Sequence, residues 1–340
     1  MTNKIWVRKN GRAEVLSYES SGESAGDDEF QSIGVEEVVV DVHFSGVNFA
    51  DIMMRLGFYK DAPPKPFVPG YEFSGVVSRV GKGVTHVQPG DKVYGGTVFG
   101  GYASRIKIGA WMVLKLPSHL SLAEGAALPV AFITAYAALV KMARVQKGDR
   151  VMIDCATGGV GTIALQMLKS IGAQTVGLTS SVEKKSIIES YGALALTHKE
   201  FQASGAQDQY DFILNSQGGK TVRAHYNRLA PAGRIVCIGL SAAINNGKRD
   251  FIALIKAAAE MPRFALISMF DLNRGVFALN ALKLMEDTRY AKHNQSDFSA
   301  ILNMGIKPHI GAIIPAAEVL RAHQMLESRK IGGKVLLSWQ

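Results

Sequence analysis

The chain has 340 residues, of which 47% are hydrophobic and 20% charged, a composition that excludes a disordered or fibrous protein and allows two sizeable cores. The net charge is +9, but the sequence contains no run of five basic residues. We therefore expect a dispersed basic surface and no nucleic-acid partner. No apolar run reaches the length of a bilayer span, and Met1–Trp6 lacks the apolar core of a signal peptide. We therefore expect a cytoplasmic protein without a membrane span.

Short alternating segments separated by turn residues fill the first third of the chain. Apolar and polar residues alternate over Glu37–Phe44, which predicts a half-buried strand. Further strands are predicted over Tyr71–Val80, Lys92–Tyr94 and Ala103–Ile108. Several short strands with turns between them favour a small β-barrel. The acidic segment Glu19–Asp28 is expected to be a surface loop.

A helical pattern over Leu122–Met142 precedes a strand, a glycine-rich turn and an amphipathic helix. The apolar run Val151–Ile153 leads into the turn, and the helix is expected to end at Gly172. The turn contains Ala156, Thr157, Gly158, Gly159, Val160 and Gly161. Glycines allow close approach of the backbone, and the N–H groups at the helix start can bind a pyrophosphate. Although Ala156 replaces the first glycine of the usual pattern, the order predicts a dinucleotide site.

Strand and helix patterns continue to alternate after this turn. Thr175–Leu178, Tyr210–Leu214 and Arg234–Gly239 are strand-like, and Glu183–Glu189 is helical. Repeated β-α-β units of this kind predict an α/β fold with a Rossmann doubly wound parallel sheet.

The end of the second strand of this sheet indicates which dinucleotide binds. No carboxylate stands there to hold the ribose hydroxyls, as NAD sites usually require. Hydroxyl and basic residues are found instead, namely Thr179, Ser180, Ser181, Lys184 and, after the next strand, Lys199. Lysines and hydroxyls suit the 2′-phosphate of NADPH, although the lysines could equally form an ordinary solvated helix face.

The last third alternates between helix and strand without a second glycine-rich turn. Helices are predicted over Phe277–Glu286 and Pro315–Lys330, an extended segment at Pro308–Ile310, and a final strand at Lys334–Ser338. Because no helix follows that strand, we expect it to join the N-terminal β domain. This gives a discontinuous domain of residues 1–125 and 265–340 and a nucleotide domain of residues 126–264.

Neither cysteines nor histidines show the spacing of a metal site. Cys155 and Cys237 fall on predicted buried strands and are expected to act as small apolar residues. The eight histidines include no H-x-x-x-H pair, and no C-x-x-C pair occurs. We therefore expect no bound metal.

Taken together, these features resemble the medium-chain dehydrogenase/reductase superfamily, and most closely its zinc-independent quinone oxidoreductase branch. The matching stretches are Gly46–Asp51, Pro69–Gly75, Val80–Val84, Val87–Val93, Leu128–Tyr136, Ala156–Gly161 and Gly332–Val335. The resemblance covers about Val35 to Leu337 and implies a GroES-like barrel domain, a Rossmann domain and a cleft between them.

The resemblance also shows which residues are missing. Zinc-dependent members place a cysteine where Asn48 stands and a histidine where Tyr71 stands, just before the glutamate matched by Glu72. Without thiolate and imidazole a tetrahedral catalytic zinc cannot be held. Hydride transfer from NADPH to a quinone or to an α,β-unsaturated carbonyl is therefore implied, without zinc.

The resemblance places three polar residues near the nicotinamide. Asn48 could donate to the acceptor oxygen or cap the local turn. Tyr59 could protonate an enolate or simply pack, and Asp51 is expected to orient its neighbours.

Further cofactor contacts are implied for Thr134, Gly239, Leu240, Ser241, Asn273 and Lys334. A homodimer is implied as well, joined at the edges of the Rossmann sheets near Gly233–Leu240, with the helical segment Phe251–Phe270 close by. Two alternatives stay open. One is a 2-alkenal or enoyl-thioester reductase of the same fold, and the other is an NADPH-binding protein with little turnover that acts through partners or RNA.

Overall fold

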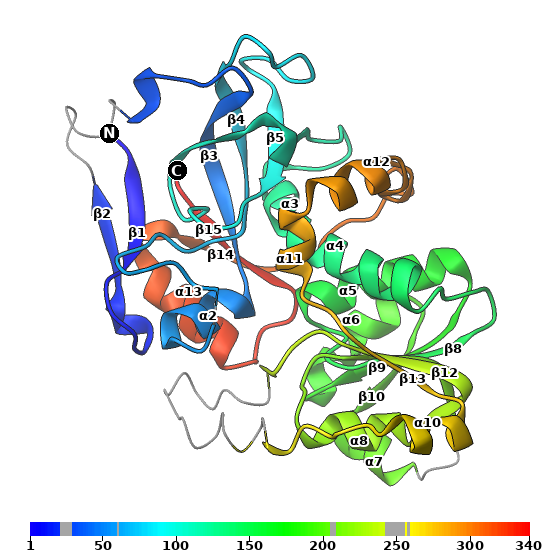
Figure 1. Ribbon diagram of the computed structural model, residues 1–340. Helices are drawn as coiled ribbons and strands as arrows, with labels where there is room; N and C mark the ends of the chain where they lie inside the picture. Colours follow the sequence, from blue (N-terminus) through cyan, green and yellow to red (C-terminus); the bar gives the residue numbers. More distant parts are fainter. Residues whose placement is uncertain (21–28, 60, 205–208, 242–255, 257–258) are drawn as a thin grey trace. The chain divides into compact units, whose positions relative to one another are not determined.

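The computed structural model describes the chain except for residues 21–28, 60, 205–208, 242–255 and 257–258 (Figure 1). The described residues divide into two compact units. The first holds those of Met1–Val130 and Lys307–Gln340, and the second holds those of Ala131–Asn245 and Asp250–Ile306. Most of the predicted loop Glu19–Asp28 and part of the segment Phe251–Phe270 lie outside the described residues.

The first unit is built on a seven-stranded sheet with the order β14-β15-β3-β4-β5-β7, in which β6 pairs with β3. Its strands are β3 (Glu37–Val47), β4 (Glu72–Val80), β5 (Lys92–Gly96), β6 (Arg105–Gly109), β7 (Val113–Lys115), β14 (Ile310–Pro315) and β15 (Lys334–Ser338). A separate antiparallel hairpin consists of β1 (Asn3–Val7) and β2 (Leu16–Ser20). The strands predicted in the first third of the chain are thus present, as the barrel-like pattern required.

Side-chain alternation explains how the first sheet forms its core. Val38, Val40 and Val42 on β3 are buried in one apolar cluster with Phe73 and Val93. Val39, between them on the strand, is buried as well, so apolar burial on β3 extends beyond the alternate positions and stabilises the sheet.

The last strand joins this first sheet, as the sequence predicted. β15 pairs antiparallel with β3, and Val335 lies opposite Val47. The pairing brings Lys334 beside Asn48, the residue that follows β3, although 286 positions separate them.

The first unit also contains the α-helices α2 (Phe49–Leu56), α3 (Leu122–Ala127) and α13 (Val319–Glu327). Short 3₁₀ turns lie at Ala13–Val15, Ala110–Met112 and Ala316–Glu318. α2 follows Asn48 directly and ends at Gly57, whose φ of 80° favours glycine. Arg55 on α2 forms a buried ion pair with Glu327 on α13, which ties together two distant parts of the chain.

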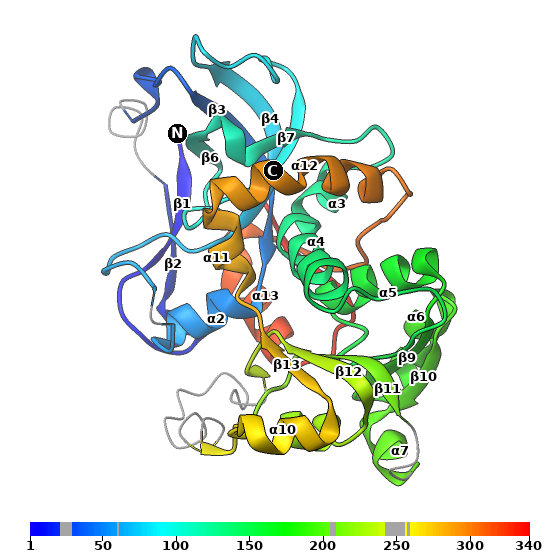
Figure 2. The same cartoon turned by 45° about the vertical axis from the view of Figure 1, so that its right-hand side comes forward.

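The second unit contains a six-stranded parallel sheet with the order β10-β9-β8-β11-β12-β13. Its strands are β8 (Arg150–Ile153), β9 (Gln174–Thr179), β10 (Leu194–Thr197), β11 (Tyr210–Asn215), β12 (Leu229–Cys237) and β13 (Gly275–Ala278). Helices cover both faces of the sheet, with α5 (Gly159–Ile171) on one side and α7 (His198–Ala203) and α10 (Leu266–Leu272) on the other (Figures 1 and 2). This is the doubly wound arrangement that the sequence predicted.

The helices of the second unit include α5 (Gly159–Ile171), α6 (Lys185–Ser190), α7 (His198–Ala203), α8 (Lys220–Tyr226), α10 (Leu266–Leu272), α11 (Ala281–Glu286) and α12 (Thr288–Leu302). α4 (Pro129–Tyr136) enters the unit and continues as a π-helical segment, Ala137–Met142, and a 3₁₀ turn lies at Val182–Lys184. α5 begins in the glycine-rich turn and ends at Gly172, where φ is 84°, as predicted.

Two expectations for the last third need correction. Phe277 and Ala278 are not helical, because they belong to β13, which pairs with β12 at the edge of the sheet. The helix begins only at Ala281, after the cap residue Asn280. Residues 265–306 lie with the second unit rather than with the N-terminal domain, because β13 extends the parallel sheet and Tyr136 on α4 bonds to side chains of α12.

Among the described residues, no helix combines the length and the apolar character needed to cross a membrane.

Candidate functional site

The glycine-rich turn connects β8 to α5 with its backbone at the helix start. Gly158 precedes the helix, and its N–H donates to the carbonyl oxygen of Cys155 at 3.0 Å. A Cβ on Gly161 would lie 2.5 Å from the carbonyl oxygen of Ala156, so only glycine fits there. The turn therefore brings backbone close to backbone at the start of α5. The first N–H groups of a helix have no partner within the helix and can bind a phosphate.

Hydroxyls and one ammonium gather at the carboxyl end of β9. Thr179 ends the strand, and its buried Oγ1 has no hydrogen-bond partner among the described residues. Lys184 Nζ donates to Ser180 Oγ at 2.8 Å. Burial lowers the pKa of Lys184, partly offset by the charges of Cys155 and Glu183. A dianionic group would find a cation and hydroxyls here.

The other predicted phosphate partners lie differently. Lys199 is exposed on the first turn of α7. Lys185, the neighbour of Lys184, forms an ion pair with Glu200 at 2.7 Å. Ser181 is half-buried just after β9. Lys184 and Ser180 are therefore the pair that the structure brings together at this strand end.

The remaining predicted cofactor residues of the second unit lie in three places: at the carboxyl ends of the strands, on α4, and at the amino ends of the strands. Gly239–Ser241 follow β12 at its carboxyl end, where the Ser241 N–H donates to the carbonyl of Ser216 at 3.3 Å. Thr134 is buried on α4. Asn273 caps α10 at the opposite edge, where its carbonyl accepts from the Ala232 N–H at 2.7 Å. The structure thus does not bring Asn273 together with the glycine-rich turn.

A buried polar cluster lies where β3, β4 and β15 of the first unit meet. Asn48 Nδ2 donates to Glu72 Oε1 at 2.9 Å. Lys334 Nζ lies 2.5 Å from Asn48 Oδ1 and 2.5 Å from Glu72 Oε1. Glu72 Oε2 accepts from the Val130 N–H at 2.8 Å. The amide of Asn48 is thus held between a cation and a carboxylate.

Asp51 is completely buried and contacts this cluster through the backbone N–H of Asn48. Its oxygens accept from the N–H groups of Asn48 and Gly70 and from the Tyr102 hydroxyl, at 2.8, 3.1 and 3.1 Å. Burial raises the pKa of Asp51 to about 7, although these hydrogen bonds and the charge of Lys334 oppose the rise. The carboxyl therefore holds the start of α2 in place. Tyr59 lies in the loop after α2 and is half-buried.

The position that carries histidine in zinc-dependent relatives has a different partner here. Tyr71 is buried, and its hydroxyl contacts Met54 Sδ at 3.0 Å. The nearby cation is the ammonium of Lys334, bonded to both Asn48 and Glu72. A lysine ammonium beside the glutamate disfavours a divalent cation at the same carboxylate.

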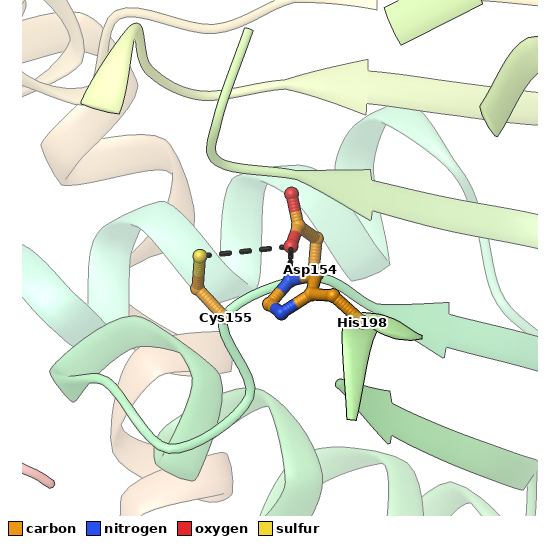
Figure 3. A group of neighbouring side chains, drawn as sticks. All are labelled: Asp154, Cys155 and His198. Carbon is orange, nitrogen blue, oxygen red and sulfur yellow. Dashed lines mark hydrogen bonds and ion pairs between the residues drawn. The ribbon is translucent and has the colours of Figure 1, made fainter. Parts of the chain in front are cut away.

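One group of side chains was not expected from the sequence. Asp154, Cys155 and His198 converge at the carboxyl edge of the second unit's sheet (Figure 3). Gln217 contacts two of them, Asp154 and His198. Burial raises the pKa of Asp154, but hydrogen bonds from His198 and Gln217 and the charges of His225 and His198 outweigh it, so the pKa lies below its ordinary value. The signal in the sequence was that both Asp154 and His198 directly follow strands.

Two family profiles match the chain. One, described as the alcohol dehydrogenase GroES-like domain, matches residues 34–118. The other, described as zinc-binding dehydrogenase, matches residues 159–260. Together with the two sheets, they define a dehydrogenase/reductase built from a GroES-like and a Rossmann domain.

Full-length relatives place the chain more closely. Mouse quinone oxidoreductase-like protein 2 is 30% identical, over 90% of this chain and 86% of that protein. The human synaptic vesicle membrane protein VAT-1 homolog is 29% identical, over 89% of this chain and 79% of that protein. The structure of Escherichia coli quinone oxidoreductase complexed with NADPH has a TM-score of 0.81 and 25% identity, covering 99% of this chain and 100% of that one. The chain belongs to the medium-chain dehydrogenase/reductase superfamily, in its quinone oxidoreductase and VAT-1 branch.

Proposed function

We propose that the protein transfers hydride from NADPH to a quinone or to an α,β-unsaturated carbonyl without a catalytic metal. The observation that carries the proposal is the Lys184–Ser180 pair at the end of β9, beside the glycine-rich turn. The bound dinucleotide would supply the hydride. It would be held by the backbone of Gly158–Gly161 and by Lys184, and the unpartnered Thr179 Oγ1 offers a further hydrogen bond.

Asn48 is the proposed donor to the acceptor oxygen. Its Nδ2 uses one hydrogen for Glu72, and no other described residue accepts the second. Lys334 fixes the amide orientation by donating to Oδ1. A preoriented N–H of this kind can stabilise negative charge on a carbonyl oxygen without a metal.

A second acceptor class is an enoyl thioester. A highly reducing polyketide synthase of Didymella fabae is 30% identical to this chain over 315 residues, which cover 16% of that protein. The likeness supports enoyl reduction as the alternative to quinone reduction, with the same cofactor and the same donor. The homodimer expected near Gly233–Leu240 needs a different interface, because β12 is not an edge strand and β13 pairs with it. We propose a homodimer joined at the β13 edge of the second unit instead.

The test is steady-state oxidation of NADPH and NADH by purified protein with ortho-quinones, para-quinones, short enones and an enoyl thioester. We expect NADPH-selective turnover that a chelator does not change, and the best acceptor identifies the branch. The metal-free mechanism would be contradicted if a chelator abolished turnover both in the wild type and in Cys155→Ala. Tight NADPH binding without turnover on any acceptor would support a binding role instead.

A further inference from the structure

Three different ligand types meet at the carboxyl edge of the second unit's sheet. Asp154 Oδ1 lies 2.9 Å from His198 Nε2 and 3.6 Å from Cys155 Sγ, and all three ligand atoms lie within 4.8 Å of one another (Figure 3). A carboxylate oxygen, a thiol sulfur and an imidazole nitrogen are the donors that bind zinc in proteins.

The parallel sheet explains why these residues meet. Asp154 and Cys155 directly follow β8, and His198 directly follows β10. Only β9 separates β8 from β10 in the sheet, so the carboxyl ends of the two strands lie at the same edge. Cys155 has a φ of 55°, a left-handed conformation that is uncommon for cysteine.

The three short contacts among Asp154 Oδ1, His198 Nε2 and Gln217 Nε2 cannot all be hydrogen bonds at the same time. Gln217 Nε2 lies 2.8 Å from Asp154 Oδ1 and 3.0 Å from His198 Nε2. If the imidazole nitrogen donates to Asp154, it has no lone pair for Gln217, and if it accepts from Gln217, it faces the carboxylate with a lone pair. A cation removes this conflict because it takes lone pairs from the carboxylate and the imidazole together.

A second observation comes from the other oxygen of Asp154. The residue is 1% exposed, and Oδ2 has no hydrogen-bond partner among the described residues. Buried carboxylates are normally paired with a positive charge or coordinate a metal. The Oδ2 atom of Asp154 is thus a buried acceptor that the described contacts leave without a donor.

We propose that Asp154, Cys155 and His198 bind one zinc-class divalent cation at the start of the glycine-rich turn. Zinc–ligand bonds of about 2.0 to 2.3 Å can be reached by small side-chain rotations, because the oxygen already lies near both of the other ligand atoms. The fourth position is left for water or for the amide oxygen of Gln217, once that amide is turned over. Thiolate and imidazole ligands favour zinc over magnesium or calcium.

The test titrates metal-free, fully reduced protein with Co²⁺, whose thiolate complexes give a ligand-to-metal charge-transfer band. We expect one Co²⁺ per chain, a thiolate band and displacement of the Co²⁺ by Zn²⁺. Because the chain has two cysteines, Cys237→Ala is the matched control. The band should be lost in Cys155→Ala and kept in Cys237→Ala.

Two further results decide the assignment. His198→Gln should weaken Zn²⁺ binding by at least about tenfold, because even the loss of an outer-shell partner costs that much. Circular dichroism confirms that each variant is folded. The proposal is wrong if the wild-type protein gives no thiolate band, if Cys155→Ala keeps it, or if folded His198→Gln binds Zn²⁺ as tightly as the wild type. None of these readouts depends on turnover, so they are separate from the test of the reductase.

Discussion

At the scale of single residues, Asp154, which follows β8, and Lys184, which lies beyond the end of β9, have different surroundings. Asp154 is buried against His198 and Gln217, whereas Lys184 bonds to a serine hydroxyl at the strand end. The proposal of NADPH as the cofactor rests on the second arrangement, because an ammonium beside hydroxyls stabilises a phosphate more than a ribose hydroxyl.

Replacing Lys184 should therefore affect NADPH more than NADH. We expect Lys184→Ala to raise the Kd for NADPH by about tenfold or more, the usual value of a hydrogen bond to a charged group, with little change for NADH. The measurement is fluorescence titration of both dinucleotides. Lys185→Ala is the control, because this neighbouring lysine forms an ion pair with Glu200. An equal increase in the Kd for NADPH in the two variants would show that Lys184 does not contact the 2′-phosphate.

Asp51 makes a prediction about pH. Its pKa is raised to about 7 in the folded protein, from an ordinary value of 3.8, because the carboxyl is buried. The folded state therefore holds this proton where the unfolded state has lost it, so the contribution of Asp51 to stability is fully present below pH 3.8 and is lost as pH rises toward 7. The fall is on the order of 4 kcal/mol.

Asp51→Asn should remove this contribution. We expect the unfolding free energy of the wild type, relative to that of the variant, to decrease as pH rises from about 4 to 7. Urea denaturation at several pH values measures the difference. A constant difference across this range would show that Asp51 does not keep its proton in the folded state.

At the scale of elements, the first unit depends on contacts between segments far apart in the chain. Arg55 on α2 is fully buried and pairs with Glu327 on α13, and the Nε and Nη1 atoms of Arg55 have no partner among the described residues. The pair holds α2, which carries Asp51, against the C-terminal segment. A buried charge that loses its partner is expensive, whereas removing both charges is not.

A double-mutant cycle tests this contact. We expect Arg55→Met or Glu327→Leu alone to cost about 3–5 kcal/mol of unfolding free energy, and the double variant to cost much less than the sum. Chemical denaturation measures each. Arg321→Met is the control, because Arg321 forms an exposed pair with Glu318 and should cost less than about 1 kcal/mol. Additive losses would mean that the two helices are held by other contacts.

At the scale of the whole molecule, local pattern and family resemblance predicted both sheets and the glycine-rich turn. The alternation over Glu37–Phe44 and the strand–turn–helix order at Val151–Gly172 are local signals, so they could be found without tertiary information. Phe277 was misassigned because an edge strand of four residues is too short to show a period.

The sites depend on contacts that no local pattern contains. Asn48 was predicted from a motif, but its partners Glu72 and Lys334 reach it through strand pairing from other parts of the chain. The Asp154, Cys155 and His198 cluster escaped detection because its ligands follow two different strands instead of sharing one short spacing. The edge of a parallel sheet brings together residues that the sequence keeps apart.

The most direct test of the account is transfer of deuterium from NADPH, dideuterated at C4, to a short enone, using metal-depleted protein under single-turnover conditions. The account predicts a reduced product that carries one deuterium on the β-carbon, with the same yield after chelator treatment. Oxidation of the cofactor without deuterium in the product, or transfer that requires an added metal, would contradict metal-free hydride transfer.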